Sequence, residues 1–247
     1  MDILKKYRLF ALVTFTIFLC SCNKESASLD IDTKETLFTQ MSPDSTGISF
    51  INSIKNQADF NIFKYRNFYN GGGVAIGDIN NDGLSDVFLT GNMEPNKLYL
   101  NKGELKFEDI SEKAGIKGNK PWSTGVVMAD INNDGLLDIY VSNAGNMEGN
   151  NHDNDLYINN GDETFTESAE KYKLDFDTYS SSAAFLDYDL DGLLDIYVCN
   201  AGNIKGDNLK NELFINNGDL TFTARAEEYK LNNNGYTTHT AFFDYDL

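Results

Sequence analysis

The chain has 247 residues, with 20 Lys and Arg against 38 Asp and Glu, which gives a formal charge of −18. Its hydrophobic content of 41% is enough to bury a core, so a chain that is disordered over most of its length is excluded. Nucleic acids and polyphosphates are excluded as partners, because no basic stripe is present to neutralise their phosphates. The charge instead favours a cation as partner.

The first 21 residues predict an export signal. A basic start, Lys5 to Arg8, precedes an apolar run from Leu9 to Leu19, which is the order found in secretory signal peptides. The run is too short for a membrane-spanning helix, which needs about 20 residues. Its end, Leu19 to Cys22, resembles the lipoprotein box of bacterial envelope proteins. The resemblance implies cleavage after Ser21 and acylation of Cys22.

We expect several acyl chains on Cys22 to anchor the protein to a membrane without spanning it. Residues 22–36 are polar and aperiodic, which predicts a flexible tether between the lipid and the folded part. The expected location is the bacterial cell envelope, at the outer membrane, on its periplasmic or its outer side. After cleavage only Cys22 and Cys199 remain, so a disulfide framework is excluded and Cys199 is expected to be a small buried strand residue.

Acidic runs recur along the chain. They begin at Asp78, Asp130, Asp187 and Asp244, at spacings of 52, 57 and 57 residues. An aliphatic strand leads into each run. After each complete run come a second aliphatic strand, a Leu-aromatic-aliphatic-Asn strand and a strand that begins with Phe. This order predicts three complete four-stranded units, at residues 71–118, 119–175 and 176–232, and the start of a fourth at 233–247.

The third strand of each unit is apolar on both faces. In the first unit Leu98 and Leu100 share one face and Tyr99 occupies the other, so burial from both sides is expected. Four-stranded sheets stacked around an axis meet this condition, so the sequence predicts an all-β fold, a β-propeller of four-stranded blades. In the lead-in at 37–70, residues 37–48 align with the fourth-strand segments and predict an outer strand that closes the ring.

The number of units is small for a closed propeller. Propellers typically have at least four blades, and the chain stops at Leu247, inside the fourth acidic run. We therefore expect a fragment that forms an open arc, an incomplete propeller with three full blades and the start of a fourth.

The acidic runs share the pattern D-x-[DN]-x-D-G-x-x-D. Alternate positions direct oxygens inward and the glycine permits a sharp turn, as in the EF-hand loop, where position seven contributes a backbone carbonyl. Only hard oxygen donors are offered, which favours Ca²⁺ over zinc or copper, and the flexible ligand set favours it over Mg²⁺. The sequence predicts about one Ca²⁺ per complete blade.

The predicted ligands are Asp78, Asn80, Asp82, Leu84 and Asp86 in unit one, Asp130, Asn132, Asp134, Leu136 and Asp138 in unit two, Asp187, Asp189, Asp191, Leu193 and Asp195 in unit three, and Asp244 and Asp246 in unit four. The alternative is that Asp, Asn and Gly only form a turn. Three loops that each gather three or four carboxylates would be unfavourable without a counter-ion, so calcium is preferred. Unit three has four carboxylates where units one and two have three, so it is expected to bind most tightly.

The units resemble FG-GAP or VCBS repeats, which form the calcium-loop blades of integrin α-subunit heads and of many bacterial surface proteins. The stretch FYNGGGVAIGDINNDGLSD, residues 68–86, resembles more closely the bacterial relatives of cartilage acidic protein. The resemblance covers residues 37–247 and implies propeller blades and calcium. Those relatives carry an ASPIC/UnbV module near the C-terminus, and this sequence shows none. Its Phe-Gly and Gly-Ala-Pro signature is degenerate, so an integrin-like ligand is not implied.

The loops between the second and third strands lie opposite the acidic loops, because the strands alternate in direction. In units two and three they span residues 143–155 and 200–212, and they are rich in Asn, Gly and Asp. One hypothesis is that they contact a glycan or protein ligand, and the alternative is a solvated connection. The candidate residues are Asn143, Asn146, Asn150, His152, Asn200, Asn203 and Asn208.

These features predict a calcium-binding envelope lipoprotein whose propeller is a non-catalytic binding or adhesion module. His152 and His239 are the only histidines, and neither adjoins a Ser, a Cys or a zinc-ligand pattern in the sequence. The alternative is a calcium-dependent polysaccharide-degrading enzyme, a lyase-like propeller with its catalytic residues outside this chain. Trp122 and the Tyr65–Tyr69 stretch are aromatic enough to stack on sugars, although blade packing accounts for them equally well.

Overall fold

The computed structural model of the protein describes residues 37–116, 120, 122–144, 153–202 and 210–243. The chain divides into two compact units, residues 1–40 and 41–247, and the second contains every helix and strand given below. No helix in the described ranges is both long enough and apolar enough to cross a bilayer. The predicted signal peptide and tether lie outside the described residues, as do the candidates Cys22, Asn146, Asn150, His152, Asn203, Asn208, Asp244 and Asp246.

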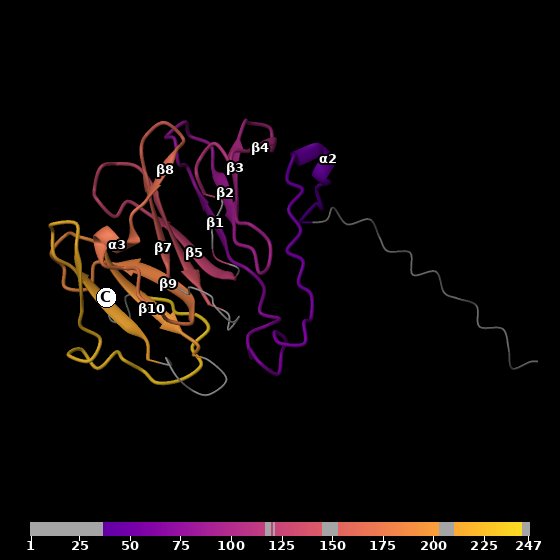
Figure 1. Ribbon diagram of the computed structural model, residues 1–247. Coiled ribbons are helices and arrows are strands. Elements are labelled where there is room, and N and C mark those ends of the chain that lie inside the picture. The colour runs from indigo at the N-terminus through magenta and orange to yellow at the C-terminus, as the bar shows by residue number, and fades with distance from the viewer. Residues whose placement is uncertain (1–36, 117–119, 121, 145–152, 203–209, 244–247) are drawn as a thin grey trace, which may run out of the picture. The chain divides into compact units, whose positions relative to one another are not determined.

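The second unit contains three four-stranded antiparallel sheets, each with its strands in chain order (Figure 1). The first sheet contains β1 (Val74–Gly77), β2 (Asp86–Leu89), β3 (Lys97–Asn101) and β4 (Phe107–Asp109). The second contains β5 (Ser123–Ala129), β6 (Asp138–Asn143), β7 (Asp155–Asn159) and β8 (Phe165–Glu167). The third contains β9 (Ser180–Leu186), β10 (Asp195–Asn200), β11 (Glu212–Asn216) and β12 (Phe222–Ala224). These three blades confirm the predicted all-β fold, an incomplete β-propeller.

The third strand of each blade is buried on both faces, as its sequence predicts. In β3 the three residues from Leu98 to Leu100 are all buried. In β7 neighbouring residues point to opposite sides: Tyr157 joins the apolar cluster shared with the first blade, and Leu156 joins the cluster shared with the third. The middle blade therefore buries apolar surface against both of its neighbours, which stabilises the stack of sheets.

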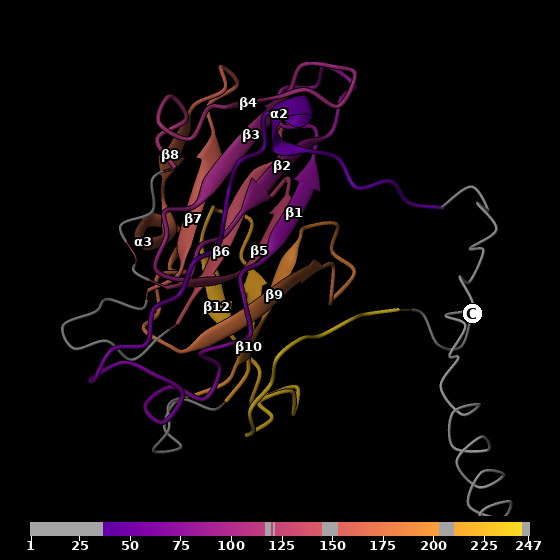
Figure 2. The ribbon, with the colours of Figure 1, turned by 90° about the vertical axis from the view of Figure 1, so that its right-hand side faces the viewer.

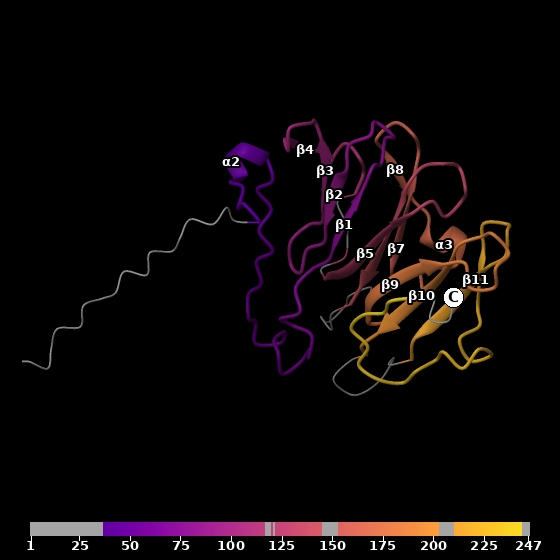
Figure 3. The same ribbon diagram turned by 180° about the vertical axis from the view of Figure 1, so that it is seen from behind.

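The innermost strands β1, β5 and β9 lie next to one another, as the side view in Figure 2 and the rear view in Figure 3 show. Hydroxyl groups link the blades at this position. Thr90 donates to the Thr124 carbonyl at 2.5 Å, and Thr124 donates to the Ser180 carbonyl at 2.7 Å. Ser181, one repeat after Thr124, donates to the Thr237 carbonyl at 2.6 Å. The repeated bond fixes how successive blades are aligned at the axis.

An aromatic cluster holds the lead-in against the entry of β5. The Trp122 ring lies 5.1 Å from that of Phe60, 5.6 Å from Tyr65 and 5.3 Å from Phe68, measured between centroids. Trp122 and Tyr65 are almost completely buried, whereas Tyr69 is 59% exposed. Packing within the protein therefore accounts for Trp122 and Tyr65.

Cys199 lies in β10 and is completely buried, as predicted. Burial raises the pKa of its thiol to about 11, so the thiol stays protonated at neutral pH. The residue therefore acts as a small packing group at the position that Ser142 occupies one repeat earlier.

The strand predicted over residues 37–48 is wrong. None of these residues is in a strand, and the segment contains a helical turn, α2 (Pro43–Thr46). Ser42 caps the turn by accepting the Ser45 N–H at 3.2 Å, and Gly47 ends it in the left-handed region at φ 81°. Each fourth-strand segment contains a strand and the turn that follows it; in the second blade this turn is α3 (Ala169–Tyr172), after β8. Residues 37–48 resemble the turn of these segments and not the strand.

The α2 turn packs against β4 as the turn after β4 packs against β8. A Cβ atom at Gly47 would lie 2.3 Å from the Phe107 carbonyl oxygen, and one at Gly115 would lie 3.5 Å from the Phe165 carbonyl oxygen. Phe107 and Phe165 are the first residues of β4 and β8. Residues 42–47 therefore occupy, beside the first blade, the place of a preceding blade's final turn.

Replacing Gly47 by alanine should destabilise the protein more than replacing Gly103. Both glycines have a positive φ, 81° and 86°, so each alanine adds about 1 kcal/mol of backbone strain. A Cβ atom at Gly103 meets nothing within 4 Å, whereas one at Gly47 meets the Phe107 carbonyl. Urea unfolding should give losses of about 1 kcal/mol for Gly103→Ala and at least about 2 kcal/mol for Gly47→Ala. Equal losses would contradict the packing of α2 on β4.

Candidate functional site

Each acidic loop connects the first two strands of a blade and is organised by its first aspartate. Asp78 accepts the N–H groups of Asp82 at 3.1 Å and of Gly83 at 2.7 Å. Asp130 and Asp187 accept the equivalent pairs at 2.9 to 3.1 Å. The glycine of each turn has φ between 86° and 91°, which glycine adopts without strain. The three loops therefore share one geometry.

The ninth residue of each loop pattern joins the loop to the third strand of its blade. Asp86 is completely buried and accepts the N–H of Ile79 at 2.9 Å and that of Asn101 at 2.7 Å. Asp138 and Asp195 are also completely buried and accept the equivalent pairs at 2.8 to 3.0 Å. One carboxylate thus ties the acidic loop to the end of the third strand in each blade.

Burial raises the pKa of all three of these carboxyl groups. The backbone N–H groups that they accept lower the pKa, and the other acidic side chains of the loop raise it again. For Asp138 the pKa reaches about 6, with Asp134 and Asp130 as the contributing neighbours. The ionised form is therefore unfavourable unless a positive charge lies close by.

The third blade gathers three carboxylates around one point. One oxygen from each of Asp187, Asp189 and Asp195 lies within 4.8 Å of the other two. Ca²⁺ holds its oxygen ligands at about 2.3–2.6 Å, so two ligands on opposite sides of one ion are about 5 Å apart. The three carboxylates are close enough to contact a single Ca²⁺, and this all-oxygen donor set fits that ion.

The first two blades differ at the third loop position, where an asparagine replaces Asp189. The Asn80 amide donates to the Asp82 carboxylate at 3.1 Å, and the Asn132 amide donates to that of Asp134 at 2.8 Å. In all three loops the leucine at position seven donates its N–H to the fifth-position aspartate at 2.8 to 2.9 Å. The residues that do so are Leu84, Leu136 and Leu193. These bonds join the fifth and seventh positions in each of the three loops, and binding of an ion by the leucine carbonyls stays a prediction.

Two candidates on the opposite face, Asn143 and Asn200, are buried and bonded within their blades. The Asn143 amide donates to the Asp153 carbonyl at 2.9 Å and to the Asp155 carboxylate at 2.8 Å. The Asn200 amide donates to the Lys210 carbonyl at 2.6 Å. Both side chains close the base of a loop, where backbone groups need a partner in place of water. The hypothesis that these two residues contact a ligand is therefore wrong.

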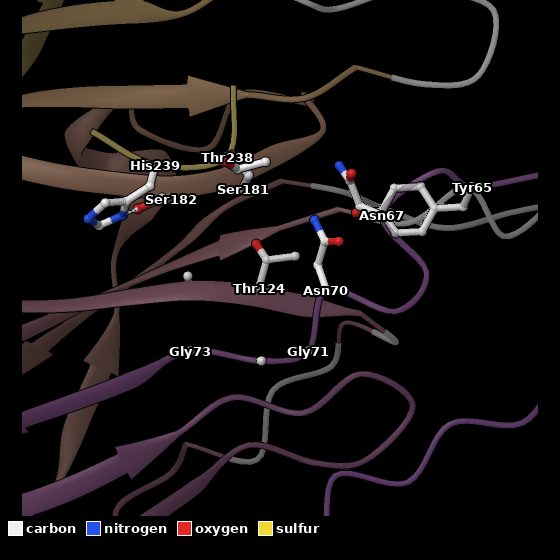
Figure 4. Close-up of a pocket in the computed structure, with 12 residues that line it drawn as sticks. Tyr65, Asn67, Asn70, Gly71, Gly73, Thr124, Ser181, Ser182, Thr238 and His239 are labelled. Atoms are coloured by element: carbon white, nitrogen blue, oxygen red, sulfur yellow. Dashed lines mark hydrogen bonds between the residues drawn. The ribbon is translucent and has the colours of Figure 1, made fainter. Parts of the chain in front are cut away.

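A pocket that the sequence analysis missed lies among the entries of the inner strands (Figure 4). Its volume is about 490 Å³, and it is lined by the end of the lead-in, the entries of β5 and β9, and residues 238 and 239. The His239 Nδ1 atom lies 3.3 Å from the Ser182 Oγ atom, so the histidine has a serine neighbour in space although not in sequence. The repeat could have revealed the pocket, because four of its lining residues stand at the same position in successive units. These residues are Gly72, Thr124, Ser181 and Thr238.

Part of the chain is similar to known proteins named cartilage acidic protein 1. The protein from Xenopus tropicalis is 41% identical over 78 residues, and the human protein is 38% identical over 76 residues. These matches cover 31% and 30% of this chain, and the chain spans only 12% of the length of either relative. A solved lectin structure from Agrocybe aegerita, described as recognising non-reducing terminal N-acetylglucosamine, is 20% identical, with a TM-score of 0.37 over 66% of this chain and 39% of the lectin.

The repeats also match a family profile. The FG-GAP-like repeat profile matches residues 58–141 and 144–198. The matched ranges take in the strands of the first two blades, apart from the last two residues of β6, and β9 and most of β10 in the third. Since they cover more than half of the sequence, the chain belongs to the FG-GAP-like repeat family.

Proposed function

We propose that this protein is a calcium-binding propeller of the bacterial cell envelope that binds a glycan or protein ligand and catalyses no reaction. The observation that supports calcium is the buried ninth-position aspartate of each loop, because its ionised form needs a nearby positive charge. The acidic residues around it would provide the remaining oxygen ligands of a Ca²⁺ ion.

In this proposal the ion makes each blade rigid. Asp78 is bonded to the turn of its loop, whereas Asp86 is bonded to the end of β3. A Ca²⁺ shared by both carboxylates would connect the turn to the sheet and remove the repulsion between them. The opposite end of the blades would then be held on a fixed scaffold, which favours ligand binding because less entropy is lost on association.

A binding role is preferred to catalysis because the described residues lack a complete catalytic group. Ser182 and His239 form a hydrogen-bonded pair, but no Asp or Glu lines their pocket in the described part of the chain to orient the imidazole. We further propose that acylated Cys22 tethers the module to the membrane through residues 22–36, on the basis of the sequence pattern.

Calcium should raise the melting temperature well above the value measured in chelator. A site occupied at 100 times its Kd adds about 2.7 kcal/mol, and 1 kcal/mol moves the melting temperature of a domain of this size by about 2–4 °C. Three sites add about 8 kcal/mol, so the shift in a thermal scan should be about 16 °C or more. Asp219→Asn, a control in the turn between β11 and β12, should keep the shift. Identical melting curves in calcium and in chelator would rule the proposal out.

Exchanging the residues at the third loop position should exchange the affinities of two blades. Asp189→Asn gives the third blade the donor set of the first, and it should weaken that site by about tenfold because affinity follows the number of ligand charges. Asn80→Asp is the matched change in the first blade, and it should strengthen the site there. Asp189 is exposed, so the substitution should leave the fold intact.

Terbium luminescence can separate the third site from the first. Tyr188 stands at the second position of the third loop and can transfer excitation to a bound terbium ion, whereas Ile79 stands there in the first loop. Tyr188→Phe should remove the signal of the third site and so identify it. An unchanged terbium affinity in Asp189→Asn would show that the order of the sites is wrong.

Calcium should stabilise the protein less as the pH falls from about 7.5 to about 5. In the ion-free protein Asp138 has a pKa of about 6, against 3.8 for the ordinary group, so the folded state holds more protons than the unfolded state between these values. Stability in chelator therefore falls as the pH rises through this window. In calcium the proton competes with the ion, so stability should rise with pH.

The quantity to measure is the difference between the two melting temperatures at each pH. Asp155 also has a pKa of about 6 and belongs to no acidic loop, so its effect is common to both conditions and cancels in the difference. The difference should grow as the pH rises through 6. A difference that is constant across this range would show that the loop carboxylates do not bind the ion.

A further inference from the structure

The pocket at the axis opens on the end of the blades opposite the acidic loops. The N–H of Thr90, at the start of the loop between β2 and β3, donates to the Gly73 carbonyl at 3.0 Å, just before β1 begins. Gly73 lines the pocket together with the equivalent entries of β5 and β9. The pocket therefore lies on the face that carries the loops between second and third strands.

The lining of the pocket is polar but contains no formally charged side chain at pH 7. It consists of amides, hydroxyls, one phenol, one imidazole and glycine backbone, and none of its residues is Asp, Glu, Lys or Arg. The chain as a whole is 23% charged and has a formal charge of −18. A wall of this kind cannot neutralise a bound ion, so an anionic or cationic ligand would lose hydration without compensation. The chemistry favours an uncharged polar ligand.

The polar groups in the pocket keep unused hydrogen-bonding capacity. Thr124 and Ser181 give their hydroxyl hydrogens to backbone carbonyls, so their oxygens remain available as acceptors. Asn67 and Asn70 extend from the lead-in into the same space (Figure 4), and each amide offers donors and an acceptor. Donors and acceptors in close alternation suit a ligand whose hydroxyl groups both donate and accept.

The size of the pocket narrows the class of ligand further. Tyr65 borders the pocket but is only 2% exposed, because its ring packs against that of Trp122 at a centroid distance of 5.6 Å. The volume of about 490 Å³ lies within the range of about 300–1,000 Å³ typical of small-molecule sites. The space suits a ligand of one or two sugar rings.

We propose that this axial pocket binds the neutral end of a saccharide. Asn67, Asn70, Thr124 and Ser181 supply the hydrogen bonds to the ligand. This inference rests on the proposed function, since it assigns a site and a ligand class to the binding module. It places the ligand at the axis, among residues that the blades hold in position, and not on the loops that differ in length between blades.

The test uses the full chain in calcium on an array of neutral oligosaccharides, with uronic-acid and phosphate-bearing saccharides on the same array. The neutral oligosaccharide with the strongest signal is then titrated into three variants. Asn70→Ala removes an exposed amide and should weaken binding about fivefold, as expected for one lost hydrogen bond. Ser182→Phe fills the pocket and should abolish binding. Asn233→Ala changes an exposed amide outside the pocket and should bind as the unaltered protein does.

Thermal melting of each variant shows whether it is folded, and Asn70→Ala decides the matter if Ser182→Phe does not fold. Neutral-glycan binding that is unchanged in Asn70→Ala would overturn the pocket assignment and leave the proposed binding function intact. Binding only to charged saccharides, or only to a protein, would also overturn the pocket assignment and leave the proposed binding function intact. A calcium-loaded chain that binds no saccharide on the array also overturns the pocket assignment, and if it binds no protein either, the proposed function fails with it.

Discussion

Each blade depends on one completely buried carboxylate. In the first blade Asp86 accepts an N–H from the acidic loop and another from the end of β3, so three parts of the sheet meet at its two oxygens. Such a group is most useful as an acceptor when it is ionised, yet burial and acidic neighbours oppose ionisation. A divalent ion resolves this conflict, because it stabilises the charge and leaves both backbone bonds in place. The same conflict is present in all three blades.

The two ends of the blades consequently differ in chemistry. At the end opposite the acidic loops, one buried network consists of neutral groups. The Asn154 amide donates to the Ser180 hydroxyl at 2.9 Å, and Ser180 donates to the Asn200 amide oxygen at 3.0 Å, all three being buried. A network of amides and hydroxyls needs no counter-ion, because no member carries a charge. This network lies at the end of the blades on which the pocket opens.

The sequence was most informative where the interacting residues lie within one repeat. Two-sided burial of residues 98–100 follows from three consecutive apolar residues, and the acidic loops follow from nine consecutive positions. Asn143 and Asn200 could not be assigned in this way, since an asparagine beside a glycine-rich loop resembles a solvated residue until its buried partners are known. The pocket joins residues as distant as Tyr65 and His239, so only the stacking of blades brings its wall together. The prediction of a strand over residues 37–48 is wrong because this segment resembles the turn after each fourth strand and not the strand itself.

The lead-in contacts the entries of three successive units. Trp122, Tyr179 and Tyr236 occupy one repeat position, and the first two are buried in the aromatic cluster that the lead-in shares with the blades. Tyr236 is 43% exposed, and the guanidinium group of Arg66 lies 4.7 Å from its ring centroid. These contacts come from residues that flank or adjoin Asn67 in the chain. Because aromatic packing on one side and a cation–π contact on the other fix this segment, the amides of the pocket are positioned before any ligand arrives, which lowers the entropy lost on binding.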